Sequence, residues 1–212
     1  MYRVYDLGTG MLLYETAQSS PVCSLSICPE EQYLAIACLD GRLHVSAFDN
    51  GMLVKEIPPF KKTLRSLHSS SKEDRNNQQM ITFDPHDSEM VAIACNRKLH
   101  IMYWRTCNIE FTFPHRDMVR SVQYHPTVSK IVCTASDDQK VRIIDVASGS
   151  VLHEIVVDAD GPLCDTAFDP NGFLIASAGL VGLLRVFQVF ADKTEFEHPS
   201  FTFHLDPVFW LD

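Results

Sequence analysis

Seven cysteines and nine histidines are the side chains of this sequence that could bind a metal ion or act in catalysis. A zinc or redox site would favour two cysteines in a C-x-x-C pair, and the sequence contains no such pair. Most of the cysteines stand inside apolar runs, which is how reduced cysteine behaves as a small core residue. The pattern predicts structural thiols, no metal and no cofactor, and it favours an intracellular protein of the cytoplasm or nucleus.

The other candidates for catalysis are better explained by structure. Two histidines recur at matching positions, to which two arginines correspond later in the chain: His44, His100, Arg142 and Arg185. A catalytic residue has no reason to recur in this way, so the series predicts a repeated polar position. Asp137 and Asp138 are adjacent in a short turn without companion ligands, which favours a turn or bracing role over metal binding. The sequence has no phosphate-binding glycine loop, G-x-S-x-G or H-E-x-x-H motif, and an enzyme is not expected.

Composition and charge indicate what kind of partner the protein has. The 212 residues are 46% hydrophobic and 21% charged, which is typical of a globular protein with a sizeable core. The formal net charge of -9 disfavours a broad electrostatic attraction to nucleic acid or anionic lipid. Met1 is followed directly by "YRVYDLGTG" without a signal-peptide pattern, and no apolar run is long enough to span a bilayer. We therefore expect other proteins as partners and no membrane association.

Four copies of one sequence pattern divide the chain. Each copy starts with an apolar residue, a second residue and a proline, and continues with a polar turn, an apolar run, a second polar turn and another apolar run. The starting triplets are Ile27-Cys28-Pro29, Phe83-Asp84-Pro85, Tyr124-His125-Pro126 and Phe168-Asp169-Pro170. Further along each copy, equivalent positions recur at intervals of 41, 56, 42 and 43 residues, at Asp6, Ala47, Tyr103, Asp145 and Gln188. Apart from one long interval, this is the period of four-stranded propeller blades.

One copy shows how the pattern folds into a sheet. Proline cannot donate a hydrogen bond to a neighbouring strand, so Pro126 ends the first strand of the unit. The turns "SDDQ" and "ASG" separate the strands that follow, and glycine permits the positive φ of a tight turn. A single sheet of this kind cannot bury its faces, whereas sheets stacked around an axis can. The predicted strands are Val119–Tyr124, Lys130–Ala135, Val141–Asp145 and Val151–Ile155.

The segment "ASDDQKVRIID" of this copy resembles the WD40-repeat family, in which the corresponding stretch ends in Trp-Asp. Here it ends in Ile144-Asp145, so the repeats are divergent. The resemblance extends from Arg3 to about Val189. It implies an all-β, WD40-like β-propeller that acts as a non-catalytic scaffold for protein–protein interactions in a multiprotein complex.

The resemblance also implies roles for individual residues. Family blades often carry a hydrogen-bonded set of a loop His, a strand Ser or Thr, a turn Asp and a strand Trp. By position, His115, Asp138 and either Thr134 or Ser136 match the first three roles and are expected to brace the blade. The Trp role falls on Ile144, which has no N–H to contribute, so we expect looser polar bracing than in a consensus blade.

The count of repeats predicts an incomplete propeller of four full blades plus the end of another. Its segments are the last strands of a partial blade (1–20), a blade (21–57), a basic Ser-rich insertion loop (58–77), three further blades (78–113, 114–157 and 158–203) and an aromatic tail (204–212). The inner strands missing from the first blade must come from this tail, from another chain or from upstream sequence. An alternative to the scaffold is therefore a structural part of a split or truncated propeller, completed by another chain, by self-association or by missing upstream sequence.

Three segments are candidates for partner binding. The insertion 58–77 has five Lys or Arg against two Asp or Glu, and it is the segment best suited to an acidic protein surface or, exceptionally, nucleic acid. Its serines are possible phosphorylation sites, and the alternative interpretation is a solvated loop without function. The tail is either an interface or a source of strands, namely the outer strand of the last blade with or without one strand of the next. The candidate contacts are Lys61, Lys62 and Arg65 in the insertion, His115-Arg116 in the loop that opens a blade, and Phe209 and Trp210 in the tail.

Overall fold

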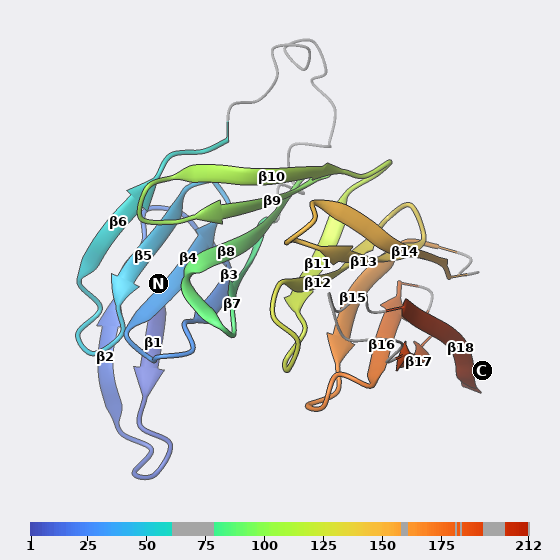
Figure 1. Cartoon of the computed structure of the whole chain (residues 1–212). Coiled ribbons are helices and arrows are strands. Elements are labelled where there is room, and N and C mark those ends of the chain that lie inside the picture. The colour runs from blue at the N-terminus through green and yellow to red at the C-terminus, as the bar shows by residue number, and fades with distance from the viewer. Residues whose placement is uncertain (61–78, 158–160, 181, 183, 193–201, 212) are drawn as a thin grey trace.

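The computed structural model describes residues 1–60, 79–157, 161–180, 182, 184–192 and 202–211, with residues 190–192 and 202–211 described by their backbone only. Within these ranges the chain is all β, and eighteen strands form five antiparallel sheets (Figure 1). The described residues include no helix that could cross a membrane.

We number the sheets 1 to 5 in chain order, and in each of them the strands follow one another as they do in the sequence. Sheet 1 contains β1 (Tyr2–Tyr5) and β2 (Leu12–Thr16). Sheet 2 contains β3 (Val22–Ile27), β4 (Tyr33–Cys38), β5 (Leu43–Ala47) and β6 (Leu53–Ile57). Sheet 3 contains β7 (Gln79–Asp84), β8 (Asp87–Cys95), β9 (Lys98–Tyr103) and β10 (Asn108–Pro114). Sheet 4 contains β11 (Val119–Tyr124), β12 (Ile131–Ser136), β13 (Lys140–Asp145) and β14 (Ser150–Val156), and sheet 5 contains β15 (Leu163–Phe168), β16 (Leu174–Gly179), β17 (Leu184–Asp192) and β18 (Thr202–Leu211).

The predicted all-β fold with four-stranded antiparallel blades is confirmed. In sheet 4 the observed strand bounds lie within one residue of the predicted ones. The tight turns between these strands include residues with positive φ, at Lys130 (62°), Gln139 (64°) and Gly149 (67°). Turns this short join each strand to its antiparallel neighbour, which is why the sequential order is kept.

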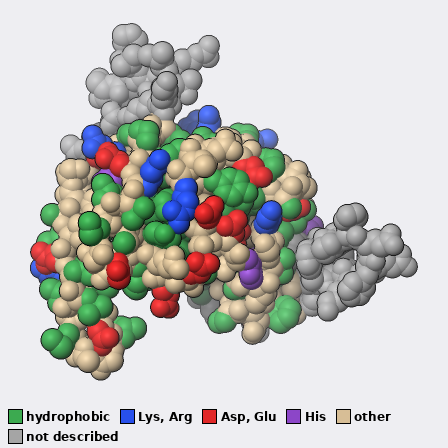
Figure 2. All heavy atoms as spheres, turned by 60° about the vertical axis from the view of Figure 1, so that its left-hand side comes forward, with side chains coloured by type: hydrophobic (Ala, Val, Ile, Leu, Met, Phe, Trp, Pro, Cys, Tyr) green, Lys and Arg blue, Asp and Glu red, His purple; other side chains and the backbone are tan. Residues whose placement is uncertain are grey.

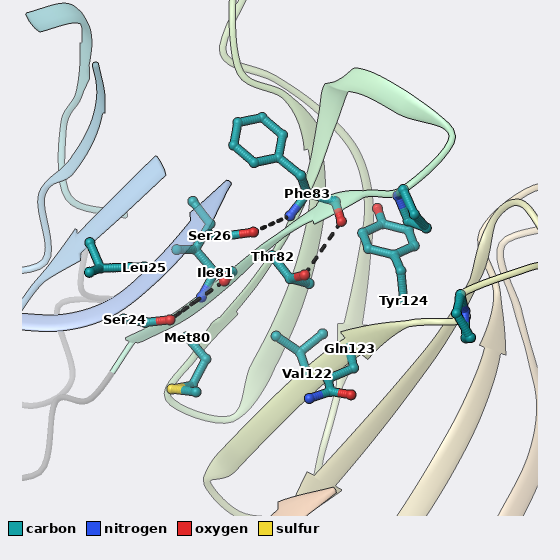
Figure 3. A pocket seen from close by; sticks show the side chains of 12 residues that line it. Ser24, Leu25, Ser26, Met80, Ile81, Thr82, Phe83, Val122, Gln123 and Tyr124 are labelled. Atoms are coloured by element: carbon teal, nitrogen blue, oxygen red, sulfur yellow. Dashed lines mark hydrogen bonds between the residues drawn. The ribbon is translucent and has the colours of Figure 1, made fainter. Parts of the chain in front are cut away.

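The sheets follow one another around an arc, with β1 and β2 at one end and β18 at the other (Figure 1). The first strand of each four-stranded sheet lies innermost, and β3, β7, β11 and β15 are neighbours in that order. The first three of these strands line an open hollow of about 370 Å³ (Figure 3). The arrangement is that of a partial propeller, in which each of sheets 2 to 4 packs its two faces against the sheets before and after it.

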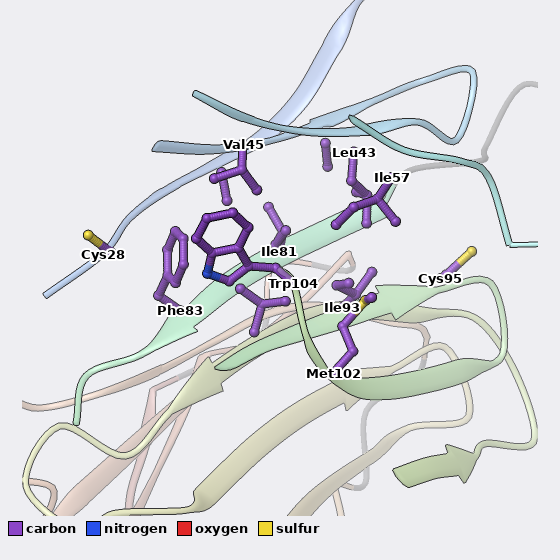
Figure 4. Close-up of a cluster of buried hydrophobic side chains, with 13 residues drawn as sticks. Cys28, Leu43, Val45, Ile57, Ile81, Phe83, Ile93, Cys95, Met102 and Trp104 are labelled. Atoms are coloured by element: carbon purple, nitrogen blue, oxygen red, sulfur yellow. The ribbon is translucent and has the colours of Figure 1, made fainter. Parts of the chain in front are cut away.

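The interface between sheets 2 and 3 shows how these faces are built (Figure 4). We call the face that a sheet turns toward the next sheet its leading face, and the opposite face its trailing face. Alternate residues of each strand point to opposite faces, so one strand serves two interfaces. Small residues on the leading face let the sheets approach closely. The leading face of sheet 2 presents Ala35, Ala37, Leu43 and Val45, which form one buried cluster with Ile81, Phe83, Val91 and Ile93 of the trailing face of sheet 3.

Trp104 directly follows β9 and belongs to this cluster. Its side chain is 1% exposed, and its indole N–H donates a hydrogen bond to the Ser88 carbonyl at 2.8 Å. Its ring lies 5.0 Å from the ring of Tyr33 in the preceding sheet. The Arg105 guanidinium stacks 4.4 Å from the indole and donates to the Tyr33 hydroxyl. Met102 stands in this copy at the position of Ile144, which the family pattern assigns to tryptophan, so the repeat pattern does not single out Trp104.

Two turn glycines allow the outer strands of neighbouring sheets to approach. Gly51 and Gly149 have φ values of 71° and 67°, a conformation that L side chains rarely adopt. A Cβ on Gly51 would lie 2.7 Å from the ring of Tyr14, and a Cβ on Gly149 would lie 2.4 Å from the ring of Phe111. Each ring belongs to the outer strand of the preceding sheet, so the same contact recurs at two interfaces.

The end of the chain differs from the predicted division into a blade ending at 203 and a separate tail. The backbone from Thr202 to Leu211 forms β18, which pairs with β17 as the outer strand of sheet 5. The tail therefore takes the strand alternative. Because it lies at the far end of the arc from β1, it does not supply the inner strands missing from sheet 1 (Figure 1).

Candidate interaction face

The loop that joins β10 to β11 spans residues 115–118 and bridges two sheets. The His115 N–H donates to the Arg97 carbonyl at 2.8 Å, and the Val119 N–H donates to the Asn96 carbonyl at 2.7 Å, which ties the loop to the β8–β9 turn of sheet 3. On the other side, the Asp137 N–H donates to the Met118 carbonyl at 2.8 Å. The loop is fastened on both sides by backbone hydrogen bonds, so its position is set by the two sheets.

The backbone hydrogen bond from the residue after the second strand to the loop before the first strand recurs in other sheets. The loops that open sheets 2 and 5 accept an equivalent bond, from Leu39 N–H to the Pro21 carbonyl at 2.8 Å and from Leu180 N–H to the Pro162 carbonyl at 2.9 Å. These loops and the turns between the second and third strands lie at the same ends of the sheets. We call the surface that they form the loop face.

His115 fixes the loop from inside. The side chain is 8% exposed, and its ring nitrogens lie 3.2 Å from the Phe113 carbonyl and 3.0 Å from the Thr134 hydroxyl. A carbonyl only accepts, so Nδ1 carries the proton and Nε2 accepts from the Thr134 hydroxyl. Burial, together with the positive charge of Arg142, lowers the pKa of His115 to about 4. The imidazole is therefore neutral at physiological pH and acts as a structural link between the loop and β12.

Asp138 holds the loop from the β12–β13 turn. Its carboxylate accepts from the Arg116 backbone N–H at 3.3 Å and from the Lys140 backbone N–H at 3.2 Å. The Arg142 guanidinium donates to both carboxylate oxygens, at 2.7 and 3.2 Å, and to Glu154 at 2.7 Å. Burial alone would raise the pKa of Asp138, but the bonds and the charge of Arg142 hold it below its usual value. The pair is almost fully buried, with side-chain exposures of 4% for Arg142 and 6% for Asp138.

The residues that were expected to brace the blade form two separate hydrogen-bonded groups in the structure. His115 bonds Thr134, which decides between the two hydroxyl residues that the sequence left open. Ser136 instead donates to the Asp117 carbonyl at 3.2 Å. Asp138 is bonded to Arg142 and to the loop backbone, and Ile144, at the Trp position, is buried in the apolar cluster between sheets 3 and 4.

Arg142 is the member of this site that the family pattern did not provide. In the sequence, the feature that points to Arg142 is the polar position that recurs in every copy, at His44, His100, Arg142 and Arg185. All four residues are at least 92% buried. At that position His100 bonds the Thr112 hydroxyl at 2.9 Å and Arg142 bonds Glu154 at 2.7 Å, each on the outer strand of its own sheet, whereas His44 bonds the Gln18 side chain in the segment before sheet 2. The sequence indicated the position, and the structure shows the partners.

Charged side chains lie next to the loop, one pair exposed and one mostly buried. Arg97 pairs with Asp117 at 3.5 Å, and Arg120 donates to Asp137 at 2.8 Å. The Arg116 side chain is exposed. On the face that Figure 2 shows, basic and acidic side chains are interspersed. Exposed hydrophobic side chains gather at the β1–β2 hairpin, at Leu7, Met11, Leu12 and Leu13.

The other candidate contacts have less structural description. Lys61, Lys62 and Arg65 lie outside the described residues. Phe209 and Trp210 lie in β18, where their Cα atoms are partnered with those of Val186 and Arg185. Among the described residues, no group of three or more His, Cys, Asp or Glu side chains is arranged to hold a metal ion.

Acidification is expected to destabilise the protein between about pH 6.5 and pH 4 in part through His115. The imidazole of the unfolded chain takes up a proton as the pH falls below its ordinary pKa of 6.5, whereas the folded imidazole stays neutral until about pH 4. Stability that is fully present above pH 6.5 is thus lost as the pH falls toward 4, by on the order of 3 kcal/mol. Urea unfolding at pH 7 and at about pH 4.5 should show a smaller loss in His115→Gln than in the parent chain. Burial also lowers the pKa of His100 and His125, so part of the loss of stability remains in the variant. Equal losses in both proteins would show that His115 does not contribute to the acid sensitivity.

Comparison with known proteins agrees with this architecture. The family model for the WD domain, G-beta repeat, matches residues 11–45 and 107–145. The Uncharacterized WD repeat-containing protein sll1491 of Synechocystis sp. is 25% identical over 152 residues, which are 71% of this chain and 39% of that protein. The Target of rapamycin complex subunit wat1 of Schizosaccharomyces pombe is 21% identical over 182 residues, which are 80% of this chain and 50% of that protein. The chain thus spans half the length or less of these curated relatives.

A solved structure shows the same fold. The crystal structure of the β-propeller domain of Cps50 (Swd1) from Myceliophteria thermophila superimposes with a TM-score of 0.73 at 14% identity, over 96% of this chain and 62% of that chain. The structural likeness shows a β-propeller fold, and the matched repeats and the WD-repeat relatives show that the chain is similar in sequence to the WD40-repeat family.

Proposed function

We propose that this chain is a non-catalytic scaffold inside the cell, in the cytoplasm or nucleus, that holds other proteins in a multiprotein complex through its loop face. The observation that carries the proposal is the fastening of loop 115–118 to both neighbouring sheets, with the Arg116 side chain exposed on it. A loop held in this way presents its side chains without a large entropic cost of ordering on binding.

Two further points support a protein partner. The WD40 family is generally one of interaction domains, and the relative from Schizosaccharomyces pombe is a subunit of the target of rapamycin complex. The net charge of -9 disfavours nucleic acid as the main ligand. At the loop face, Arg116 is suited to an acidic side chain of a partner, and Lys61, Lys62 and Arg65 are proposed as a second basic contact.

Charge reversal at Arg116 tests the proposal. The tagged parent chain and the Arg116→Glu variant are purified from the protein's own cells, and co-purifying proteins are quantified by mass spectrometry. We expect a several-fold loss of at least one stoichiometric protein in the variant, with an unchanged melting temperature. The control is Arg3→Glu, because Arg3 is also a half-exposed arginine but lies on the β1–β2 hairpin.

If the Arg116→Glu variant captures the same amounts of co-purifying proteins as the parent chain, the loop is not part of the contact surface. If the triple reversal of Lys61, Lys62 and Arg65 also leaves capture unchanged, the scaffold proposal loses both of its proposed contacts. Copurification of nucleic acid in place of protein would contradict the proposed class of partner.

A further inference from the structure

The two ends of the sheets differ in charge. The turns between first and second strands and between third and fourth strands lie at the ends opposite to the loop face, and we call the surface that they form the turn face. Among the residues whose side chains the structure describes, these turns and the strand residue on either side of each carry eight Asp or Glu and two Lys or Arg. The loop face, counted in the same way, carries four Asp or Glu and five Lys or Arg. The turn face is therefore the acidic end of the molecule.

The carboxylates of the two faces also differ in their partners. Each of the four on the loop face forms an ion pair with an arginine, as Asp117 does with Arg97. None of the eight on the turn face forms an ion pair with a described residue. Of the two cations there, Arg105 is already paired with Glu89 at 3.0 Å. The negative charge of the turn face is thus not neutralised locally, and it attracts cationic groups.

Hydrogen bonds within the turns hold carboxylates of this face in place. Asp6 accepts from the Thr9 hydroxyl at 2.7 Å and from the Thr9 N–H at 2.6 Å, and these bonds lower the pKa of Asp6. Asp169 accepts from the Leu174 N–H at 2.7 Å. Carboxylates that are already ordered lose little conformational entropy when a cationic partner binds.

Two buried oxygens near the β7–β8 turn give a second, independent indication of a cation. Asp84 is 0% exposed, and its Oδ1 accepts from the His86 N–H at 2.8 Å, but its Oδ2 has no hydrogen-bond partner among the described residues. Tyr124 is 6% exposed, and its hydroxyl, which also lacks such a partner, points toward the end of β7 near Phe83 (Figure 3). Unpaired polar atoms in a protein interior are costly. One ammonium or guanidinium group can donate to a carboxylate and to a hydroxyl oxygen at once.

These oxygens belong to the turn-face end of the open hollow between the innermost strands. At the ends of β7 and β11, the hollow is lined by Phe83, Pro85, Tyr124 and Pro126. Its volume of about 370 Å³ lies in the range of pockets that hold small ligands. A cationic side chain that enters the hollow from the turn face therefore comes to lie near Asp84 and Tyr124.

We propose that the turn face binds a basic, lysine-containing segment of another protein, and that one cationic side chain of this segment donates to Asp84 Oδ2 and to the Tyr124 hydroxyl. Charge complementarity identifies this occupant, because an acidic surface without local counter-charges repels nucleic acid, anionic lipid and acidic peptides. The inference does not depend on the contact proposed at Arg116, since that residue lies on the loop face.

Neutralisation of exposed turn-face carboxylates tests the surface. The tagged chain is purified from the protein's own cells, and a carbodiimide, which joins carboxylates to lysine amines, marks the bound segment before mass spectrometry. Cross-links from the turn face to a basic segment of another protein are expected in the parent. A triple variant, purified without the cross-linker, should capture several-fold less of that protein. It combines Glu30→Gln, Glu31→Gln and Asp49→Asn, all three at exposed residues.

A matched control makes the same change in net charge away from the turn face. Glu15, Glu56 and Glu110 are exposed on the outer strands β2, β6 and β10, and their combined replacement by Gln should leave capture unchanged. Equal capture by the parent and the turn-face variant would overturn the proposed surface, and so would an equal loss in the control. Cross-links to lysines of a second copy of this chain, and to no other protein, would overturn the proposed partner and indicate self-association.

Tyr124→Phe tests the buried end of the site. The hydroxyl has no hydrogen-bond partner among the described residues, so the variant, stripped of its partner at high salt, should melt at the same temperature as the parent. Capture of the cross-linked protein should nevertheless fall several-fold, because the cation loses one of its two acceptors. Unchanged capture would overturn the placement of a cationic side chain in this end of the hollow.

Discussion

Trp104→Ala is expected to lower the free energy of unfolding by about 3–5 kcal/mol. The side chain is 1% exposed between sheets 2 and 3, and its removal leaves a cavity in the cluster that contains Phe83 and Val45. It also leaves the Ser88 carbonyl without the indole donor. For a chain of this size, the loss corresponds to a fall of about 6–20 °C in melting temperature, measured by circular dichroism or calorimetry.

Trp104→Phe separates packing from the hydrogen bond. Phenylalanine keeps a ring against Tyr33 and Arg105 but has no N–H to donate, so an intermediate loss is expected. A loss in Trp104→Ala no larger than about 1 kcal/mol would show that the two sheets do not depend on this contact.

Asp138→Ala is expected to cost a similar amount, about 3–5 kcal/mol, for an electrostatic reason. The substitution leaves the Arg142 guanidinium almost fully buried with Glu154 as its remaining carboxylate partner. It also removes the acceptor for the Arg116 backbone N–H, so the loop face loses one of its attachments. Urea unfolding of the parent and the variant at pH 7 measures the difference.

Two controls distinguish the buried charge from the loss of any ion pair. Asp138→Asn keeps an acceptor oxygen but no charge, and it should destabilise less than alanine. Glu15→Ala removes an ion pair with Arg3 in which both side chains are more than 40% exposed, and it should cost at most about 1 kcal/mol. Equal effects of Asp138→Ala and Glu15→Ala would show that burial of Arg142 carries no penalty.

The strands were predictable because their signals are local. In the copy around Val119–Tyr124, an apolar strand, a proline and two polar turns follow one another, and the backbone obeys that order. The same local signals left the aromatic tail open between an interface and the outer strand of the last blade. Its place in sheet 5 depends on pairing with β17, which is a contact between segments separated along the chain.

The candidate site was predictable in part. His115 and Thr134 were identified by their positions in the repeat, and they are bonded. Thr134 and Ser136 share one face of β12, so the choice between them depends on which hydroxyl lies within reach of the His115 ring. The ion pair of Asp138 with Arg142 depends on burial by the neighbouring strands. Trp104 was missed because it lies two residues beyond the position that the repeat assigns to tryptophan.

The sequence by itself determined the repeat, the all-β class, the order of strands and the polar positions that recur, because hydrophobic alternation and turn residues act over a few neighbouring positions. Only the tertiary structure decided which faces are covered. Leu25 and Val122 are equivalent apolar residues in the repeat, yet one is half exposed and the other buried, because burial depends on whether a neighbouring sheet is present. Packing between distant segments is therefore what separates the buried core and the fastened loop face from the open ends of the arc.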